Sequence, residues 1–319
     1  MKLDESKQHQ DILLDEAVDL IIRLQNDPEN PVTAEMINAW CGRSALHEQT
    51  WRRIEKLYGA SGQVLNYQRR AERYTVMSRR NVLLAGLLFL GGGTFLYTVG
   101  PSILMRQRAD YITAKGEVRH IRLEDQSQVT LGPDSAIAVE YVQSQRVVKL
   151  LAGMAYFEVT RDTQRSFTVY SDNTQITALG TAFEVSNDAG IITVGVDHGL
   201  VEARASGELS MGERLQQGQW LVFDPARQTV ERSERSANQI ASWRDNYLIA
   251  EQEQLSSLVA RIGRWHNGRI VIADPSIGRK RISGIFDLSN PLVALEAVVN
   301  PAGGKVYQLT STLTIISPF

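Results

Sequence analysis

The ten residues ITALGTAFEV (176–185) carry the pattern on which the fold prediction rests. Short runs of β-branched, aromatic and small apolar residues lie on either side of Gly180-Thr181, and a glycine between two such runs is a turn signal. The stretch therefore predicts two short strands joined by a tight turn.

Runs of the same kind recur on both sides of this stretch, about every ten residues from 110 to 223, with no helical pattern between them. The predicted strands span 118–123, 128–131, 136–142, 147–151, 155–160, 166–170, 175–179, 182–186, 191–196, 200–204 and 219–223. This series is typical of an all-β sandwich, barrel or β-solenoid, and spacing alone does not choose among them. We therefore expect one all-β domain over 110–223.

A polar linker at 224–242 separates this domain from residues 243–319, which are expected to form a small α/β module. Its predicted elements are a helix at 251–265, strands at 269–273 and 280–286, a helix at 292–299 and a hairpin of strands at 305–309 and 313–317. Such a module exposes a sheet edge that a partner strand could extend.

Upstream of the strands, the chain has no charged residue between Arg80 and Arg106. As a helix, such a stretch is long enough to cross a hydrocarbon core of roughly 30 Å. Residues 81–101 are therefore predicted to form one transmembrane helix, with a buried core helix as the alternative.

Basic residues are more frequent before this span than after it, so the positive-inside rule places the N-terminus in the cytoplasm and the larger C-terminal part outside. Arg79 and Arg80, followed by the apolar run, also resemble a twin-arginine export signal. They are explained equally well as topology charges, and both interpretations export the C-terminal part.

Residues 1–77 are predicted to form an all-α arm of three helices, the second beginning near Thr33. Helices this short must bury their apolar faces against each other or against a partner. The arm contains no catalytic motif, and we expect it to hold another protein.

Five residues of the arm are candidates for that contact. Leu24, Trp40 and Trp51 carry its apolar faces, and the core is the favoured place for the two tryptophans. Arg52 and Arg53 are polar candidates, because arginine and aromatic residues dominate interface energetics.

Composition excludes several classes of function. The net charge of −2 shows no nucleic-acid footprint, and Cys41 is the only cysteine, so no disulfide is expected. The five histidines have no zinc-binding spacing, and there is no phosphate loop, dinucleotide fingerprint or nucleophile elbow. We expect no metal, no cofactor and no direct nucleic-acid partner.

Gly180-Thr181 is the one chemically suggestive feature. A tight turn can bring the threonine hydroxyl to the glycine carbonyl, where attack would convert the peptide into an ester by an N→O acyl shift. From the residues alone, a purely structural turn is the favoured interpretation.

Five motifs in order resemble the FecR family of transmembrane regulators. They are LEDQSQVTL (123–131), VVKLLAGMAYFEV (147–159), SFTVY (166–170), ALGTAFEV (178–185) and VGVDHGLVE (194–202). The arm is similar to the family's anti-sigma domain, and residues from Trp243 resemble its C-terminal module, which is related to the secretin and TonB-receptor N-terminal domain.

The sequence departs from the family pattern at two places. The usual D-G-S is Asp125-Gln126-Ser127 here, which loses a preferred turn glycine. The usual G-E-A-Y-F has Met154 in place of the glutamate, which we expect to remove a surface charge.

The resemblance implies a single-pass inner-membrane anti-sigma regulator, with the N-terminus cytoplasmic and the C-terminus periplasmic. The arm would bind an extracytoplasmic-function sigma factor, and the exported part would contact the signalling domain of a TonB-dependent outer-membrane receptor, typically one for a ferric siderophore. Site-specific proteases would release the sigma factor. The resemblance also implies self-cleavage, with Thr181 as nucleophile and Gly180 supplying the attacked carbonyl.

Two other classes remain open at this point. One is a membrane-anchored periplasmic enzyme or binding protein, which would need a cluster of ionisable residues that the sequence does not show. The other is a cell-envelope assembly protein, which would associate with itself and bind no sigma factor.

Overall fold

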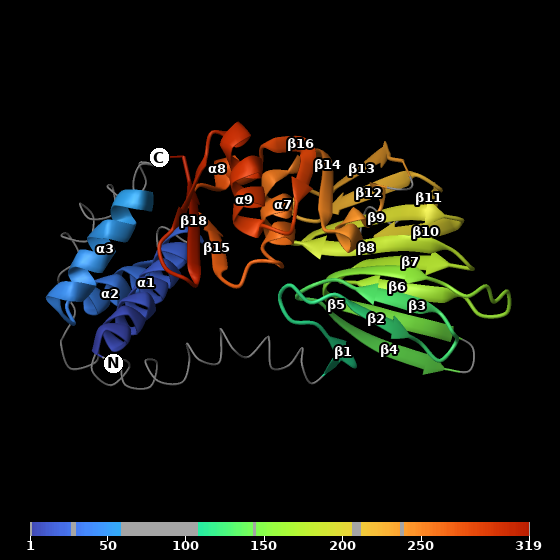
Figure 1. Cartoon of the computed structure of the whole chain (residues 1–319), viewed down its shortest axis with the longest axis horizontal. Helices are drawn as coiled ribbons and strands as arrows, with labels where there is room; N and C mark the ends of the chain where they lie inside the picture. The colour runs from blue at the N-terminus through green and yellow to red at the C-terminus, as the bar shows by residue number, and fades with distance from the viewer. Residues whose placement is uncertain are drawn as a thin grey trace. The chain divides into compact units, whose positions relative to one another are not determined.

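The computed structural model describes residues 2–26, 30–58, 108–142, 145–205, 212–236 and 239–318 (Figure 1). The chain divides into two compact units, each assembled from segments that are distant in sequence. The first unit comprises Met1–Gly86, Gly268–Arg279 and Val299–Phe319, and the second comprises Leu87–Asn267 and Lys280–Val298.

The N-terminal part of the first unit consists of α1 (Lys2–Asn26), α2 (Pro31–Cys41) and α3 (Ala45–Tyr58). α2 begins two residues before the predicted start at Thr33. The Asn30 side chain caps it by accepting a hydrogen bond from Val32 N at 3.0 Å, and Pro31 fits the first helical turn. α1 contributes the longest apolar face, with Val18 and Ile21 fully buried.

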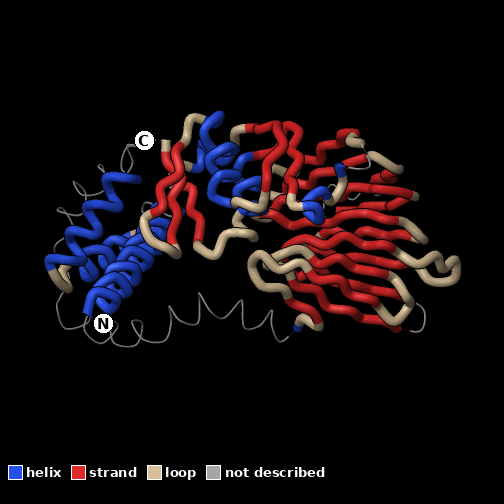
Figure 2. Tube along the Cα trace, viewed as in Figure 1, coloured by secondary structure: helices blue, strands red, loops and turns tan. Residues whose placement is uncertain are grey.

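The second unit is dominated by a 13-stranded sheet, drawn in red in Figure 2. Its strands are β1 (Tyr111–Ile112), β2 (Arg119–Arg122), β3 (Gln128–Leu131), β4 (Ala136–Val142), β5 (Gln145–Glu158), β6 (Phe167–Ser171), β7 (Thr174–Ala178), β8 (Ala182–Asp188), β9 (Ile191–His198), β10 (Leu200–Ala205), β11 (Glu213–Gln216), β12 (Gln219–Asp224) and β13 (Thr229–Glu234). The main path through the sheet is β11-β10-β7-β6-β5-β8-β9-β12-β13. The predicted series of short strands is confirmed in outline, but residues 147–151 and 155–160 belong to one strand, β5, and β1, β11 and β13 were not predicted. β13 lies in the expected linker 224–242, because its pairing with β12 extends the sheet.

β5 joins the two halves of this sheet. Its first half pairs with β4 and, in parallel, with β6, whereas its second half pairs antiparallel with β3 and β8. Gly153 separates the halves with φ +90°, where an added Cβ would lie 2.0 Å from Ser135 Oγ. Side chains from both halves, such as Val148 and Phe183, meet in one hydrophobic core. A sheet folded onto a shared core is a sandwich rather than a solenoid.

The C-terminal residues contain helices and strands that belong to both units. In the second unit, η3 (Ser242–Asp245) precedes β14 (Tyr247–Gln254), which pairs antiparallel with β16 (Arg281–Asp287), and α7 (Leu255–Ile262) and α9 (Pro291–Val299) follow β14 and β16. In the first unit, β15 (Arg269–Ile272) pairs in parallel with β18 (Leu313–Ser317), which also pairs antiparallel with β17 (Lys305–Gln308). The short helix α8 (Pro275–Gly278) and η4 (Asn300–Ala302) complete the first unit's C-terminal elements.

The helix predicted over 251–265 is shorter than expected. Residues 251–254 continue β14, because Glu253 and Gln254 pair with Ile282 and Arg281 of β16. Helix α7 starts only at Leu255. The periodicity of the apolar residues therefore predicted the helix correctly for 255–262. It was wrong at 251–254, where sheet pairing decides the conformation, and at 263–265, which form a turn.

The predicted transmembrane helix at 81–101 lies outside the described residues. No helix in the described parts of the chain is both long and apolar enough to cross a bilayer. For the described residues, we therefore correct the expected fold class to a helical N-terminal part, a large β domain and mixed C-terminal elements, among which no helix could span a membrane. The described residues likewise do not support the expected single-pass inner-membrane placement.

Gly153→Ala is expected to destabilise the β domain by about 2–4 kcal/mol, because the new Cβ adds a steric clash to the strain of a positive φ. Gly190→Ala is the matched control. Its φ is +81° but no atom lies within 4 Å of the added Cβ, so only the strain of about 1–2 kcal/mol applies. Urea unfolding followed by tryptophan fluorescence measures both, and equal losses would contradict the role assigned to Gly153.

Candidate functional site

The turn between β7 and β8 holds Gly180-Thr181, the dipeptide singled out from the sequence. Gly180 has φ +126°, and an added Cβ would lie 2.9 Å from Arg161 Cβ and 3.0 Å from Arg161 Cα. Both the backbone conformation and the space therefore require glycine at this position. Leu179 next to it is 55% exposed, so the turn itself lies at the surface.

Thr181 is buried immediately after the glycine, with 3% of its surface exposed. Its carbonyl oxygen accepts a hydrogen bond from Val159 N at 2.9 Å, which fixes the main chain. Its Oγ1 atom is buried and has no hydrogen-bond partner among the described residues. A buried hydroxyl without a partner is unusual in a folded protein, and here it belongs to the one residue for which sequence suggested chemistry.

A second glycine makes room for this threonine. Gly199, in the turn between β9 and β10, has φ +89°, and an added Cβ would lie 2.6 Å from Thr181 Cγ2. The threonine side chain is therefore confined by a neighbouring turn as well as by its own main chain. The sequence offered no signal for this contact, because Gly199 follows Thr181 by a whole hairpin.

The structure places the candidate residues of the arm in two environments. Leu24, Trp40 and Trp51 are buried at 5%, 5% and 6% exposure, and Trp40 Nε1 donates to Glu16 Oε2 at 2.7 Å. These three residues are positioned as parts of the core. The topology candidates 79 and 80 lie outside the described residues.

Arg52 and Arg53 are exposed on α3, where Arg52 Nη2 donates to Glu48 Oε1 at 2.7 Å within the same helix. This pair spans one helical turn and leaves the guanidinium open to solvent, with 73% of the Arg52 side chain exposed. Of the candidates for a protein partner, these two arginines are the accessible ones.

A chain of buried ion pairs went unnoticed in the sequence. Asp188, at the end of β8, accepts from Arg261 Nε and from Arg264 Nη2, each at 2.9 Å. Arg261 Nη1 lies 3.4 Å from Glu253 Oε2, and Glu253 Oε1 accepts from Arg235 Nη2 at 2.7 Å. Asp188 and Arg261 are 73 residues apart, so no local motif reveals the pair.

Burial alone would raise the pKa of Asp188, but the guanidinium groups of Arg261 and Arg264 outweigh it and hold the pKa below its usual range. Glu184, also on β8, shows the opposite balance, because burial dominates and raises its pKa although Ala241 N and Trp243 Nε1 donate to it. Asp188 is thus a charged structural residue.

Few groups in the described residues suit catalysis. Burial, together with Glu48 and Glu55, raises the pKa of the Cys41 thiol to about 11, which keeps it protonated at neutral pH. Nowhere in the described ranges do three His, Cys, Asp or Glu side chains gather closely enough to hold a metal ion.

Two parts of the chain match known protein families. Residues 109–202, which include Gly180-Thr181 and most of the sandwich, match the family described as FecR protein. The chain carries a FecR domain. Residues 15–57, which cover most of the helical arm, match a domain of unknown function, DUF4880. The family resemblance predicted from the sequence is confirmed.

Two crystal structures, at 1.65 and 2.50 Å resolution, show a similar fold. Both are of a candidate anti-sigma factor from Parabacteroides distasonis ATCC 8503, with 21% sequence identity and a TM-score of 0.59. Each alignment covers 66% of this chain and 98% of the other. No curated protein matches the chain at a significant level.

The structure shows how the chain accommodates the two departures from the family pattern. Gln126, which replaces the turn glycine, adopts φ +69°, so the turn keeps the conformation that glycine favours. Met154, by contrast, is fully buried, and an added Cβ at Gly132 would lie 2.3 Å from its Cγ. The expectation that Met154 replaces a surface charge was wrong, because the side chain is buried against Gly132.

Asp188→Asn is expected to lower the free energy of unfolding by about 3–5 kcal/mol at pH 7, because it leaves two buried guanidinium groups without their carboxylate. A depressed folded-state pKa stabilises the fold above the unfolded-state pKa of about 4, and this contribution is lost as the pH falls through the lower folded-state value. The difference between wild type and variant should therefore shrink on acidification below about pH 4.

Urea unfolding at a series of pH values measures this difference. Asp162→Asn is the control, because the Asp162–Arg165 pair is short-range and lies at the surface. A loss for Asp188→Asn that is as small as the control's, or that does not change with pH, would contradict the assignment.

Proposed function

We propose that this protein is an anti-sigma regulator whose helical arm, α1–α3, binds an extracytoplasmic-function sigma factor. The observation that carries the proposal is the order of the two family matches, DUF4880 over the arm and FecR over the sandwich. The description of the structurally similar protein as a candidate anti-sigma factor supports the same function.

The exposed surface of the arm suits a protein partner. Arg52 and Arg53 lie on α3, and Ile12 and Val32 are 51% and 61% exposed on α1 and α2. Arginine is among the residue types that contribute most to binding energy at protein interfaces. Trp40 and Trp51 contribute indirectly, by holding the helices that present these residues.

The proposal extends to a second partner, the signalling domain of a TonB-dependent receptor, typically one for a ferric siderophore. Site-specific proteases would then release the sigma factor. The sheet β14-β16 supports this role, because it has only two strands and exposes Tyr247 and Ile285 at 50% and 71%. A free strand edge bearing apolar side chains is a surface to which an extended segment can add.

We also propose that the chain cleaves itself between Gly180 and Thr181. Thr181 Oγ1 would attack the Gly180 carbonyl carbon and pass its proton to the departing Thr181 nitrogen, so that an ester replaces the peptide bond. Water would then hydrolyse the ester, leaving a carboxylate on Gly180 and a free amine and hydroxyl on Thr181. Two observations support this step: Thr181 Oγ1 has no hydrogen-bond partner among the described residues, and Gly180 has a positive φ.

The double variant Arg52→Glu/Arg53→Glu is expected to weaken sigma-factor binding by about tenfold or more, because charges at the centre of an interface contribute strongly. Titration calorimetry of the purified full chain against extracytoplasmic-function sigma factors of its source organism measures this change. Arg279→Glu/Lys305→Glu is the matched control, since it makes the same charge change at exposed positions outside the arm.

The double variant Tyr247→Glu/Ile285→Glu provides the second arm of this experiment, because both side chains are exposed on β14-β16 and the whole chain is kept. It should abolish binding of the receptor signalling domain and keep sigma-factor binding. Equal sigma-factor affinities for the arm variant and the control would contradict binding through α3, and receptor binding that survives Tyr247→Glu/Ile285→Glu would remove the role of β14-β16.

Thr181→Val is expected to abolish self-cleavage, because valine keeps the shape of threonine and the contact with Gly199 but lacks the hydroxyl. Thr181→Ser keeps the hydroxyl and should keep cleavage. A blot of the full chain tagged at both ends should show fragments of 1–180 and 181–319 for wild type and serine, and one intact band for valine. One intact band in all three would remove self-cleavage from the mechanism.

A further inference from the structure

Two tight turns lie against each other beside the proposed cleavage site. Ala178, before the β7–β8 turn, pairs with Val201, after the β9–β10 turn. Ala182, after the first turn, pairs with His198, before the second. These antiparallel pairs hold the two turns side by side, so a contact between the turns follows from the order of the strands.

The contact joins Gly199 of the β9–β10 turn to the Thr181 side chain. A Cβ added at Gly199 would lie 2.6 Å from Thr181 Cγ2, 3.1 Å from its Cβ and 3.2 Å from its Cα. Carbon atoms in good contact are about 3.5–4.0 Å apart, so even an alanine at this position would displace the methyl group. The φ of Gly199, +89°, is a separate reason for glycine and does not involve Thr181.

The hydroxyl and the methyl group of Thr181 turn together about the Cα–Cβ bond. Oγ1 has no hydrogen-bond partner among the described residues, so no hydrogen bond described there selects the rotamer. The residue is buried, and a β-branched side chain has few staggered positions to choose from. The space that Gly199 leaves for Cγ2 therefore decides where Oγ1 points.

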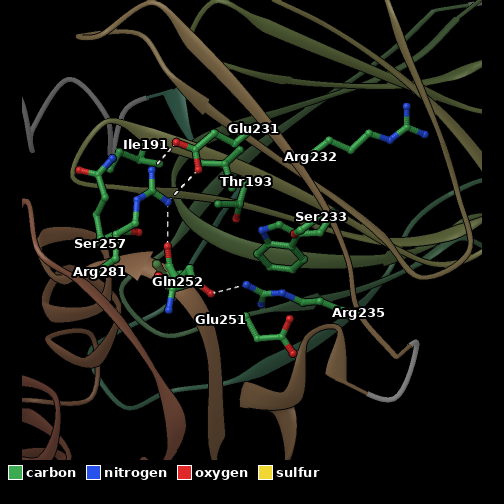
Figure 3. A pocket seen from close by; sticks show the side chains of 14 residues that line it. Ile191, Thr193, Glu231, Arg232, Ser233, Arg235, Glu251, Gln252, Ser257 and Arg281 are labelled. Atoms are coloured by element: carbon green, nitrogen blue, oxygen red, sulfur yellow. Dashed lines mark hydrogen bonds and ion pairs between the residues drawn. The ribbon is translucent and has the colours of Figure 1, made fainter.

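Other buried hydroxyls show that the lack of a partner does not by itself mark a reactive residue. Ser171 Oγ and Ser257 Oγ are also buried without a hydrogen-bond partner among the described residues. Ser257 lies in helix α7 and lines a cavity of the second unit (Figure 3). Neither serine follows a glycine. Thr181 differs from both, because it follows Gly180 and packs against Gly199.

We propose that Gly199 is a positioning residue for cleavage between Gly180 and Thr181, an inference that rests on the self-cleavage proposed above. The ring that closes during the attack contains the Gly180 carbonyl carbon and Thr181 N, Cα, Cβ and Oγ1. It cannot close from the rotamer in which Oγ1 points away from N. The space at Gly199 takes up the methyl group and so holds Oγ1 in the attacking position. Gly199 acts only through this methyl group and takes no part in the chemistry.

Pulse–chase of the full chain, tagged at both ends, measures the rate at which fragments 1–180 and 181–319 form. Gly199→Ala should slow this rate by about tenfold or more, because a displaced methyl group turns Oγ1 out of position. Gly190→Ala is the matched control and should be cleaved at the wild-type rate. Its φ is +81°, but no atom lies within 4 Å of its added Cβ. Equal rates for the two variants would overturn the proposal.

A rescue variant separates positioning from a general effect on the fold. Serine at position 181 keeps the hydroxyl but lacks Cγ2, so Gly199→Ala has no methyl group to displace in the Thr181→Ser chain. The double variant should therefore recover most of the rate that Gly199→Ala loses, relative to Thr181→Ser alone. A double variant that stays intact while Thr181→Ser is cleaved would show that Gly199 acts through the fold, and would overturn the proposal.

Failure of self-cleavage itself gives a different result. No fragments from the wild type or from Thr181→Ser would remove the cleavage, and the role of Gly199 with it. Fragments from the wild type, Thr181→Ser and Gly199→Ala at equal rates would remove only the role of Gly199. The contact is also measurable without cleavage, because Gly199→Ala should lower the unfolding temperature of the Thr181→Val chain more than Gly190→Ala does. Equal losses there would contradict the contact.

Discussion

The structure of the β domain depends on one strand that pairs in two directions. β5 is 14 residues long, and its halves complete different parts of the 13-stranded sheet. Gly153 allows the change of direction, because its positive φ and its approach to Ser135 leave no room for a side chain. The chain's only cysteine is in the arm, so hydrogen-bonded pairing and packing hold this domain together without a disulfide.

Buried charges give this sandwich its specificity. Arg146, which is fully buried, donates to Asp125 Oδ2 at 2.7 Å and to two backbone carbonyls, and Tyr141 donates to the same carboxylate. Burial of such a pair contributes little net free energy, but a competing arrangement would leave a charge unpaired in the interior. The Asp188 cluster does the same for α7, whose Arg261 must meet β8. Both clusters therefore select one arrangement of the strands and helix around them.

The proposed activities are spread over separate parts of the chain. The arm presents arginines on helices whose tryptophans are buried, and the β7–β8 turn holds a buried threonine hydroxyl that has no hydrogen-bond partner among the described residues. This division suits a regulator, in which binding and processing occur at different places and no cluster of catalytic side chains is needed.

The sequence by itself determined the strand series of 110–223, the helices of the arm and the turn at Gly180-Thr181, because periodicity and turn residues are local properties. It failed where partners distant in the chain decide the outcome. Residues 251–254 became strand through pairing with β16, and Met154 is buried although its family counterpart suggested a surface position. The role of β5 and the Asp188 ion pairs came only from the tertiary structure, because burial and pairing bring together side chains that no local pattern connects.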